Sequence, residues 1–450
     1  MSDKYLVVGA GKSGIAASEL LLRKGMCPVL YDGNDKLDKE AFYEKNSTLK
    51  DVEIILGELR NEDLTDIKAA ILSPGIPTDL PFVDKIREAK IEIWGEIELA
   101  YILGKGSVCA ITGTNGKTTT TALTGEIMKR HFNDVFVVGN IGVPYTTVAD
   151  KTTDDSVIVL EVSSFMLETI DKFHPKASAI LNITPDHLNR HHTMENYIKA
   201  KEDITLNQTS SDVCVLNYED EVLREFGKNV DTKVVYFSSA RVLEEGLFYS
   251  DGKIFWNRDG KTEEIISVDE MNILGLHNFE NAMAAIAMAD AFYVPMDTIR
   301  DGLRSFEAVE HRIEYVCEKR GIKFYNDSKG TNPDAAIKGI QAMDRPTLLI
   351  GGGYDKDSTY DEWIESFDGK VKKLVLIGQT REKIADCAAS HGFNDYVFCD
   401  TFEEAIDMCY KNAVSGDAVL LSPACASWGM FPNYEERGRI FKEYVRNLSE

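Results

Sequence analysis

A short glycine-rich segment constrains the fold more than any other feature of this sequence. It follows the apolar run 108–111 and comprises Gly113, Thr114, Asn115, Gly116, Lys117, Thr118 and Thr119. The order predicts a strand, a tight turn and a helix start, where glycines let successive N–H groups point at one anion. The lysine adds charge, and the first threonine hydroxyl can join a Mg²⁺ shell. Ile111 stands where the usual phosphate-loop pattern has glycine, and a simple turn before a helix is the alternative.

The length and charge of the chain limit the number of domains and the kinds of partner to be expected. With 450 residues, about three domains of about 150 residues each are expected. Lys and Arg number 50 against 74 Asp and Glu, giving a net charge of -24, which argues against an electrostatic hold on nucleic acid or an anionic membrane.

The cysteines and the N-terminus indicate in which cellular compartment the protein is expected. The eight cysteines form no C-x-x-C pair and several fall inside apolar runs, so they are expected to be small buried hydrophobes in a reducing compartment. They are Cys27, Cys109, Cys214, Cys317, Cys387, Cys399, Cys409 and Cys425. The N-terminus enters a strand without a signal-peptide pattern, and no apolar run approaches about 18 residues. A cytoplasmic protein without membrane insertion is expected.

The first segment, residues 1–94, has the pattern of a compact α/β domain. A strand at 4–8 runs into the G-x-G-x-x-G segment 9–14, then a helical pattern and a second strand that ends in Asp32. This order predicts a diphosphate or nucleotide near a helix N-terminus, with Asp32 on ribose hydroxyls. Further strands are expected at 52–56, 69–72 and 91–94. Ser73 follows one of them, where parallel strands deliver ligand contacts, or it simply begins a Pro-Gly turn.

The central segment, residues 95–308, carries an acidic residue at a strand end. A strand at 134–138 opens on Gly139 and Asn140, and an apolar strand at 157–162 contains Glu161. A carboxylate there is costly to bury unless it meets a cation. Mg²⁺ contact is therefore expected, with a buried ion pair as the alternative.

Three histidines follow the next expected strand, at 179–183. Because no cysteine or second ligand group lies at zinc spacing, a zinc site is not expected. His187 is the functional candidate, while His191 and His192 are expected to cap or solvate the turn. The following stretch, 194–208, predicts a helix on which Lys199 and Lys201 would be ordinary solvated lysines.

Residues 213–267 predict short strands with hairpins added to a parallel core. Their turns include Asp251-Gly252 and Asp259-Gly260. An Ala-rich helix follows, started by Asn278 and Asn281, for which helix capping is the alternative role.

The last segment, residues 309–450, predicts a third α/β domain. A strand pair within 317–328 is followed by four apolar strands, each with polar or small residues at its end. The segment holds no complete catalytic set. It is expected to present a few side chains to a ligand bound elsewhere, namely Asp327, Lys329, Thr331, Lys356 and Ser427.

Seven motifs in order along the whole chain resemble those of the Mur ligases, cytoplasmic ATP-dependent enzymes that build the peptide stem of the peptidoglycan precursor. They are GTNGKTT at 113–119, LEVSSF at 160–165, NITPDHLNRH at 182–191, GLHNFENAMAA at 275–285, EHR at 310–312, NDSKGTNP at 326–333 and LSPACAS at 421–427. The resemblance implies a Rossmann-like UDP-substrate domain at 1–94, an ATP-binding domain at 95–308 and a Rossmann-like amino-acid domain at 309–450. A hinge near 308–310 would close the last domain.

The resemblance also implies an activity. ATP would phosphorylate the L-alanyl carboxylate of UDP-N-acetylmuramoyl-L-alanine, and D-glutamate would attack the acyl phosphate, with two Mg²⁺ ions and a monomeric enzyme expected. Lys117, His187 and Lys201 would be catalytic, the last of them carbamylated. The glycine loop would bind ATP together with Asn278, His311, Arg312 and Asp327. The metal ligands would be Thr118, Glu161, His187 and Lys201.

The same resemblance assigns the other two substrates. The UDP-substrate would meet Gly11, Lys12, Ser13, Gly14, Asp32, Ser73 and Asn140. D-Glutamate would meet Thr331, Lys356, Ser427, Trp428 and Tyr434. Gly33 stands where the family often has Thr, and Trp428 and Tyr434 stand where Leu and Phe are familiar.

Two alternatives stay open on the sequence. One is a related ligase for a different substrate, although residues 1–94 count against a folylpolyglutamate ligase. The other is an NAD-binding regulatory protein with a phosphate-loop switch.

Overall fold

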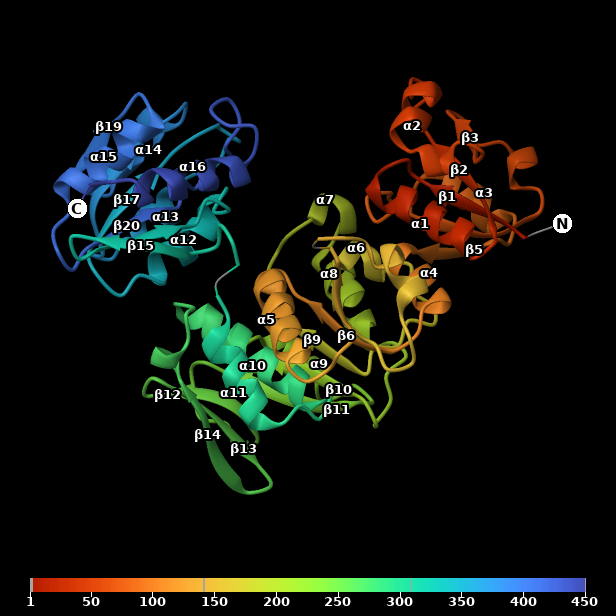
Figure 1. Cartoon of the computed structure of the whole chain (residues 1–450), viewed down its shortest axis with the longest axis horizontal. Coiled ribbons are helices and arrows are strands. Elements are labelled where there is room, and N and C mark those ends of the chain that lie inside the picture. Colours follow the sequence, from red (N-terminus) through yellow and green to blue (C-terminus); the bar gives the residue numbers. More distant parts are fainter. Residues whose placement is uncertain (1–2, 141, 308, 450) are drawn as a thin grey trace. The chain divides into compact units, whose positions relative to one another are not determined.

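The chain folds into three open β-sheets with helices packed against them. The computed structural model describes residues 3–140, 142–307 and 309–449. It divides into two compact units, residues 1–268 with 280–303 and residues 269–279 with 304–450 (Figure 1). The first unit holds two of the sheets and the second unit holds the third. The three-domain α/β fold class is confirmed. The domain boundaries at 94 and 308 stay predictions. The predicted hinge at 308–310 includes residue 308, which lies outside the described residues.

The first sheet is a parallel Rossmann-like sheet with strand order β3-β2-β1-β4-β5. Its strands are β1 Lys4–Val8, β2 Cys27–Asp32, β3 Glu53–Leu56, β4 Ile67–Leu72 and β5 Glu92–Gly95. Its helices are α1 Lys12–Arg23, α2 Lys39–Lys45, α3 Pro81–Glu88 and α4 Glu96–Leu103. Strand β1 lies at the centre, so the predicted glycine segment after it opens at the carboxyl edge of the sheet.

The second sheet has nine strands in the order β14-β13-β12-β11-β10-β9-β6-β8-β7. They are β6 Ser107–Thr112, β7 Val135–Gly139, β8 Val157–Glu161, β9 Ala177–Ile180, β10 Val213–Asn217, β11 Lys233–Ser238, β12 Gly246–Ser250, β13 Lys253–Arg258 and β14 Lys261–Ser267. All neighbours from β7 to β12 pair in parallel, and β13 and β14 add an antiparallel ribbon. The hairpin prediction is therefore confirmed only for β12 to β14, since β10 and β11 extend the parallel core.

The two predicted hairpin turns are present. Asp251 and Gly252 have φ of 48° and 75°, and Asp259 and Gly260 have φ of 52° and 69°. Two consecutive positive φ angles define the turn whose twist matches the flanking strands, and Asp-Gly is its preferred sequence.

Helices cover the second sheet, and one of them corrects a prediction. They are α5 Lys117–Lys129, α6 Ser164–Leu167, α7 Leu188–His191, α8 Met194–Glu202, α9 Glu221–Phe226, α10 Leu276–Asp290 and α11 Met296–Ser305. Helix α10 begins at Leu276, so Asn278 and Asn281 do not start it. Asn278 donates back to the Leu274 carbonyl at 2.7 Å, and Asn281 accepts from Thr120 at 3.2 Å.

The third sheet has the order β15-β16-β20-β17-β18-β19, with only β15 antiparallel. Its strands are β15 Glu314–Lys319, β16 Ile322–Asn326, β17 Thr347–Gly351, β18 Val371–Leu376, β19 Tyr396–Phe398 and β20 Ala418–Leu421. Its helices are α12 Pro333–Gln341, α13 Asp361–Glu365, α14 Arg381–Ser390, α15 Phe402–Asn412 and α16 Tyr434–Arg446. The predicted strand pair and the four later strands are confirmed.

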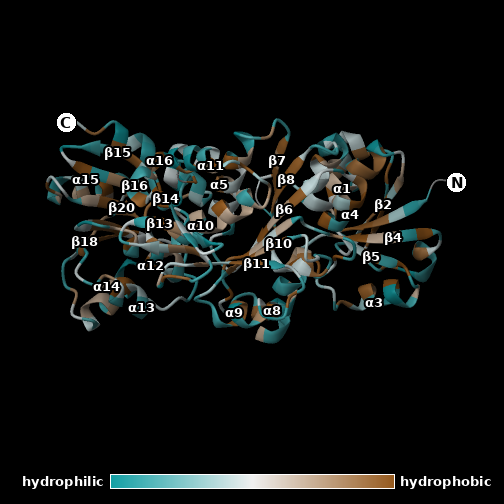
Figure 2. Ribbon diagram, turned by 90° about the horizontal axis from the view of Figure 1, so that it is seen from below, coloured by the Kyte–Doolittle hydropathy of each residue, from teal (hydrophilic) through white to brown (hydrophobic). Residues whose placement is uncertain are grey.

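Apolar side chains gather on the strands. Every residue of β8, β17 and β20 is buried, and Figure 2 shows the central strands mostly brown between bluer helices. Strands buried on both faces are expected where helices cover both sides of a parallel sheet. Across the described ranges, no helix combines the length and apolar character needed to cross a membrane.

Candidate active site

The glycine loop joins strand β6, which lies between β9 and β8 inside the second sheet, to helix α5. Gly113 and Gly116 have φ of 148° and 85°, values that favour glycine. A Cβ on Gly116 would lie 2.3 Å from the Asn281 side-chain oxygen, so the close approach also requires glycine. The open N–H groups of a helix N-terminus and the curled backbone before it together form an anion site.

A segment after β9 holds this loop in place. The Asn182 side chain accepts from the Asn115 N–H at 2.8 Å, and its carbonyl accepts from the Thr114 N–H at 2.9 Å. The Thr114 hydroxyl accepts from the Thr184 N–H and lies 3.0 Å from the Tyr197 hydroxyl. The loop is therefore fixed before any ligand arrives. The sequence analysis missed Asn182, although a polar residue just past a strand of the parallel core is a recognisable signal.

Two lysines converge on one carbonyl of the loop. Lys117 donates to the Gly113 and Thr114 carbonyls at 2.8 and 2.9 Å, and Lys201 donates to Gly113 at 2.9 Å. Lys201 is only 2% exposed, and burial together with the Lys117 charge lowers its pKa to about 7. The expectation of a solvated lysine is wrong for Lys201. It is confirmed for Lys199, which is exposed and pairs with Asp203 at 2.7 Å.

Glu161 ends strand β8 as a buried carboxylate with one vacant oxygen. One oxygen accepts from the Asn140 side chain at 2.8 Å, and the other has no partner among the described residues. The structure shows no cation paired with it in the described ranges, so the buried ion pair is not found. A buried oxygen without a partner is costly. Carboxylate and threonine hydroxyl oxygens, here Glu161 with Thr118, fit a hard cation such as Mg²⁺.

The three histidines have different surroundings. His187 is half exposed and lies against the Phe165 ring, with centroids 4.9 Å apart. His191 is buried, with a ring nitrogen 2.9 Å from the Ser164 hydroxyl, and burial lowers its pKa. His192 is exposed. The expectation that His191 caps or solvates the turn is wrong, because its buried ring packs against Phe165 and Tyr197, with centroids 5.4 and 5.2 Å apart.

A cavity of about 470 Å³ opens beside the glycine segment of the first sheet. Segments from both sheets of the first unit line it. The predicted UDP-substrate residues that it brings together are Gly11, Lys12, Ser13, Asp32, Ser73 and Asn140. The side chain of Lys12 donates to the Gly142 carbonyl at 2.6 Å across this cavity wall. The seventh predicted residue, Gly14, is not in the lining, and a Cβ there would lie 1.8 Å from the Gly9 carbonyl.

Two polar side chains of this cavity differ in whether their oxygens already have hydrogen-bond partners in the protein. Asp32 accepts from the Ala10 and Asn34 N–H groups at 2.8 and 2.9 Å, so both of its oxygens hold the loops. The Ser73 hydroxyl is buried without a protein partner in the described part of the chain. Ser73 is therefore free to bind a ligand oxygen.

The second unit holds the four residues predicted to meet adenine and ribose and buries all of them except Arg312, which is half-buried. His311 lies 2.9 Å from the Asn326 amide, and Asp327 accepts from the Ser422 hydroxyl at 2.6 Å. Burial raises the pKa of Asp327 to about 7. The Nε of Arg312 is buried and has no partner in the residues described. The fourth predicted residue, Asn278, donates its amide to the Leu274 carbonyl just before α10.

The residues predicted for D-glutamate are only partly together. The Lys356 ammonium lies 5.9 Å from the centroid of the exposed Trp428 ring. Ser427, which precedes Trp428 in the sequence, is buried. Tyr434 instead packs edge-on against His311, with centroids 6.0 Å apart. Thr331 is half-buried in the turn before α12.

A chain with three α/β sheets, in which a glycine loop with two converging lysines follows a strand of the second sheet, is typical of nucleotide-using α/β enzymes. Three family models match in order: "Mur ligase MurD-like, N-terminal domain" at 3–95, "Mur ligase middle domain" at 111–289 and "Mur ligase, glutamate ligase domain" at 311–425. The UDP-N-acetylmuramoylalanine–D-glutamate ligase of Lachnoclostridium phytofermentans is 56% identical over 100% of this chain and 99% of its own. That of Lachnospira eligens is 55% identical, over 98% of each chain.

Solved structures agree on the fold. The UDP-N-acetylmuramate-alanine ligase of Thermotoga maritima has a TM-score of 0.60 at 18% identity over 99% of both chains. A MurF structure from Acinetobacter baumannii has a TM-score of 0.61 at 15% identity, over 98% of this chain and 93% of that one. The chain belongs to the Mur ligase family. It is a ligase, and the alternative of an NAD-binding regulatory protein is set aside.

Proposed function

We propose that this protein joins D-glutamate to the L-alanyl carboxyl group of UDP-N-acetylmuramoyl-L-alanine and uses ATP to do so, in peptidoglycan precursor synthesis. Full-length relatives at 56% and 55% identity carry the name of that ligase. The observation that supports the chemistry is the rigid glycine loop with Lys117 and Lys201 on the same carbonyl. ATP as the nucleotide is supported by the MurF ligase of Thermotoga maritima, whose structure in complex with ADP shares the fold with a TM-score of 0.58.

The reaction follows from the weakness of a carboxylate as an electrophile. A carboxylate oxygen attacks the terminal phosphorus of ATP, and ADP leaves, which produces an acyl phosphate. The amine of D-glutamate then attacks the acyl carbon, and the tetrahedral intermediate expels phosphate while the nitrogen loses a proton. Positioning and charge stabilisation supply most of the rate in such phosphoryl transfers. A loop fixed before binding meets both requirements.

The loop and its lysines would bind the triphosphate. Lys117 would turn from the loop carbonyls towards the phosphates, as a point charge on developing negative oxygen. Thr118, Glu161, His187 and Lys201 would hold two Mg²⁺ ions, a role for which the vacant Glu161 oxygen is the support. When bound, such ions neutralise phosphate charge and orient the oxygens.

Lys201 would bind its metal as a carbamate. A carbamate forms when a neutral amine attacks CO₂ and releases a proton, so the amine must first lose its charge. The pKa of about 7 that burial and Lys117 impose supplies a neutral amine at physiological pH. The product carries a carboxylate, which is a suitable ligand for a hard cation.

The remaining assignments extend over both units. The cavity that Lys12, Asp32 and Ser73 line would bind the UDP-substrate, with the vacant Ser73 hydroxyl on a diphosphate oxygen. In the second unit, Arg312 and Asp327 would meet the nucleotide together with Asn278 and His311. D-Glutamate would meet Lys356, whose charge suits an acidic amino acid, along with Thr331, Ser427, Trp428 and Tyr434.

We further propose the cytoplasm as the location and a monomer as the working state. The eight cysteines are free thiols in the structure, which suits a reducing compartment. The three domains would meet at 94 and 308, close to the limits of the matching family models.

Phosphate release by the purified protein tests the function. Release from ATP should require UDP-N-acetylmuramoyl-L-alanine and D-glutamate together, and Lys117→Ala should lower kcat by about 10²- to 10³-fold, the size of one lost transition-state donor. Equal release with L-alanine or L-lysine in place of D-glutamate would assign a different substrate. Unchanged turnover in Lys117→Ala would remove the phosphate-loop assignment.

A further inference from the structure

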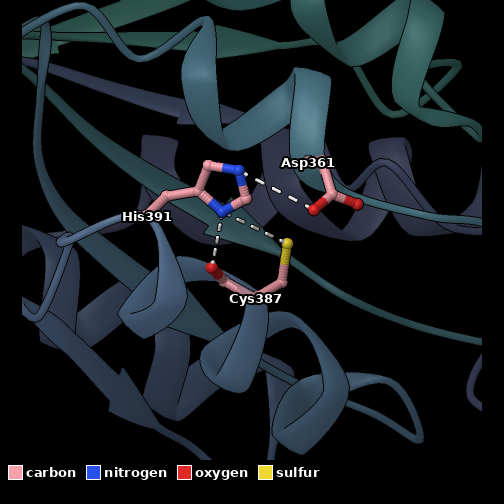
Figure 3. A group of neighbouring side chains, drawn as sticks. All are labelled: Asp361, Cys387 and His391. Atoms are coloured by element: carbon pink, nitrogen blue, oxygen red, sulfur yellow. Dashed lines mark hydrogen bonds and ion pairs between the residues drawn. The ribbon is translucent and has the colours of Figure 1, made fainter.

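Two neighbouring helices of the second unit place metal-binding side chains opposite each other. Helix α13 carries Asp361 and Glu365, and the C-terminal end of α14 carries Cys387 and His391 (Figure 3). Residues four apart lie on one face of a helix, and the two helices pack together. Each helix therefore contributes a pair of potential ligands to one shared surface.

The distances suit a single small ion. The Nε2 atom of His391 lies 3.7 Å from Asp361 Oδ1 and 3.5 Å from Glu365 Oε1. Two atoms bound at zinc–nitrogen and zinc–oxygen lengths with a tetrahedral angle are about 3.3 to 3.5 Å apart, so the Glu365 oxygen is at that separation and the Asp361 oxygen slightly beyond it. One ligand atom from each of Asp361, Cys387 and His391 lies within 4.8 Å of the others, and no other such group occurs in the described residues.

The imidazole is oriented as in metal-binding histidines. Its Nδ1 lies 3.0 Å from the Cys387 carbonyl oxygen and 3.2 Å from the Ser390 hydroxyl. An Nδ1–H that donates to this carbonyl leaves Nε2, the ring nitrogen nearest the two carboxylates, with a free lone pair. Figure 3 shows the Cys387 sulfur next to Nδ1, 4.0 Å away, and Asp361 next to Nε2.

We propose that Asp361, Cys387 and His391 form a structural site for Zn²⁺ or a similar borderline-soft divalent cation, with Glu365 as a further carboxylate beside the His391 ring. A thiolate and an imidazole select zinc over Mg²⁺, which prefers oxygen ligands alone. Binding would form a sulfur–metal bond and release the thiol proton of Cys387 to solvent. This site is separate from the Mg²⁺ sites of the proposed function.

The site would stiffen a segment that the proposed reaction uses. Helix α13 has only five residues and follows the loop that carries Lys356. Lys383 of α14 already pairs with Asp355 in that loop at 3.1 Å. A metal that joins α13 to α14 would fix both ends of the loop against one helix.

A simpler arrangement accounts for the same ion pairs without a metal. A protonated His391 between Asp361 and Glu365 would be attracted to both carboxylates. That arrangement does not require the Cys387 thiolate. Sulfur ligation therefore separates the two arrangements.

Cobalt(II) can report sulfur ligation in the full-length protein. With excess Mg²⁺ present to occupy oxygen-ligand sites, a Co²⁺ titration should give one equivalent of a sulfur-to-cobalt charge-transfer band and release of a thiol proton. Zn²⁺ should displace the Co²⁺ and slow alkylation of Cys387, which peptide mass mapping can follow.

Matched cysteine variants locate the ligand. Cys387→Ser should abolish the band, whereas Cys317→Ser, at another half-buried cysteine on β15, should retain it. Asp361→Asn should weaken Co²⁺ binding by at least about tenfold, as loss of one ligand or its support does. Absence of the band in the wild type, or its persistence in Cys387→Ser, would overturn the proposal.

Discussion

Replacing Lys201 with methionine should make the protein more stable and inactive. The Lys201 side chain is 2% exposed, and burial, with the nearby Lys117 charge, lowers its pKa from 10.5 to about 7. The unfolded chain binds the same proton with ordinary affinity, so the buried charge destabilises the folded state. Methionine has a similar length and no charge.

The size of the effect follows from the pKa difference. A depression of about 3.5 units corresponds to about 5 kcal/mol at or below pH 7, since each unit is about 1.4 kcal/mol. The lost hydrogen bond to the Gly113 carbonyl offsets about 1 kcal/mol, but Lys117 still donates to that carbonyl. Methionine at position 201 should therefore stabilise the fold by about 2 to 4 kcal/mol at pH 7.

The pH dependence has a definite sign. Between pH 7 and 10.5 the unfolded chain holds a proton on Lys201 that the folded chain lacks, so wild-type stability rises with pH across this window. The advantage of the methionine variant should shrink to about 0.4 kcal/mol at pH 9.5, after the lost hydrogen bond is subtracted, and vanish near about pH 10.

Thermal unfolding in carbonate-free buffer at pH 7 and 9.5 measures both quantities, with phosphate release as the activity assay. Lys199→Met on the same helix is the matched control. Lys199 is 74% exposed in an i,i+4 ion pair with Asp203, so its replacement should change stability by at most about 0.5 kcal/mol. A Lys201→Met protein that melts below wild type at pH 7, or whose advantage grows with pH, would refute the reasoning.

Three further variants test buried carboxylates. Glu98 is fully buried and accepts the three N–H groups of 171–173 at 2.8 to 2.9 Å, so Glu98→Ala should cost about 3 to 5 kcal/mol in denaturant unfolding. Glu161→Gln should lower kcat by about 10²-fold or more. Its melting temperature should not fall, because glutamine keeps the hydrogen bond to Asn140 and removes a buried charge. A normal kcat would contradict the metal-binding role of Glu161. The pKa of Asp327 is raised from 3.8 to about 7, so its cost to stability grows from pH 4 to 7, and Asp327→Asn should show a melting advantage that increases over that range.

Local chemistry allowed much of the fold to be predicted from the sequence. Two glycines fix the phosphate loop because no other residue fits φ of 148° and 85° there. Asp251-Gly252 and Asp259-Gly260 fix two hairpin turns for the same reason. Such features depend on a few consecutive residues, and the structure confirms them at the predicted positions.

Burial of polar side chains was harder to predict, because it depends on contacts made across the fold. Lys201 looks like Lys199 in sequence, yet the two positions lie about 200° apart around a helix. Tyr197 and Lys201 are four residues apart on the buried face of α8, and the ammonium lies 4.7 Å from the tyrosine ring. The four-residue spacing from the apolar ring of Tyr197 indicates that Lys201 lies on the buried face, and the prediction of a solvated lysine did not use this spacing.

Charged atoms without a partner support two sites that the sequence had already suggested. Among the buried side-chain atoms without a partner in the described residues, two belong to charged groups, Glu161 Oε2 and Arg312 Nε. A buried polar atom without a hydrogen-bond partner is costly, although Arg312 is only partly buried and keeps its charge near Asp327. Each of these atoms falls at a position assigned to a ligand of opposite sign, a cation for Glu161 and an anionic nucleotide for Arg312. If ligand binding is what offsets their cost, Mg²⁺ with ATP should raise the melting temperature of the wild type by more than that of Glu161→Gln, and equal shifts would contradict this assignment.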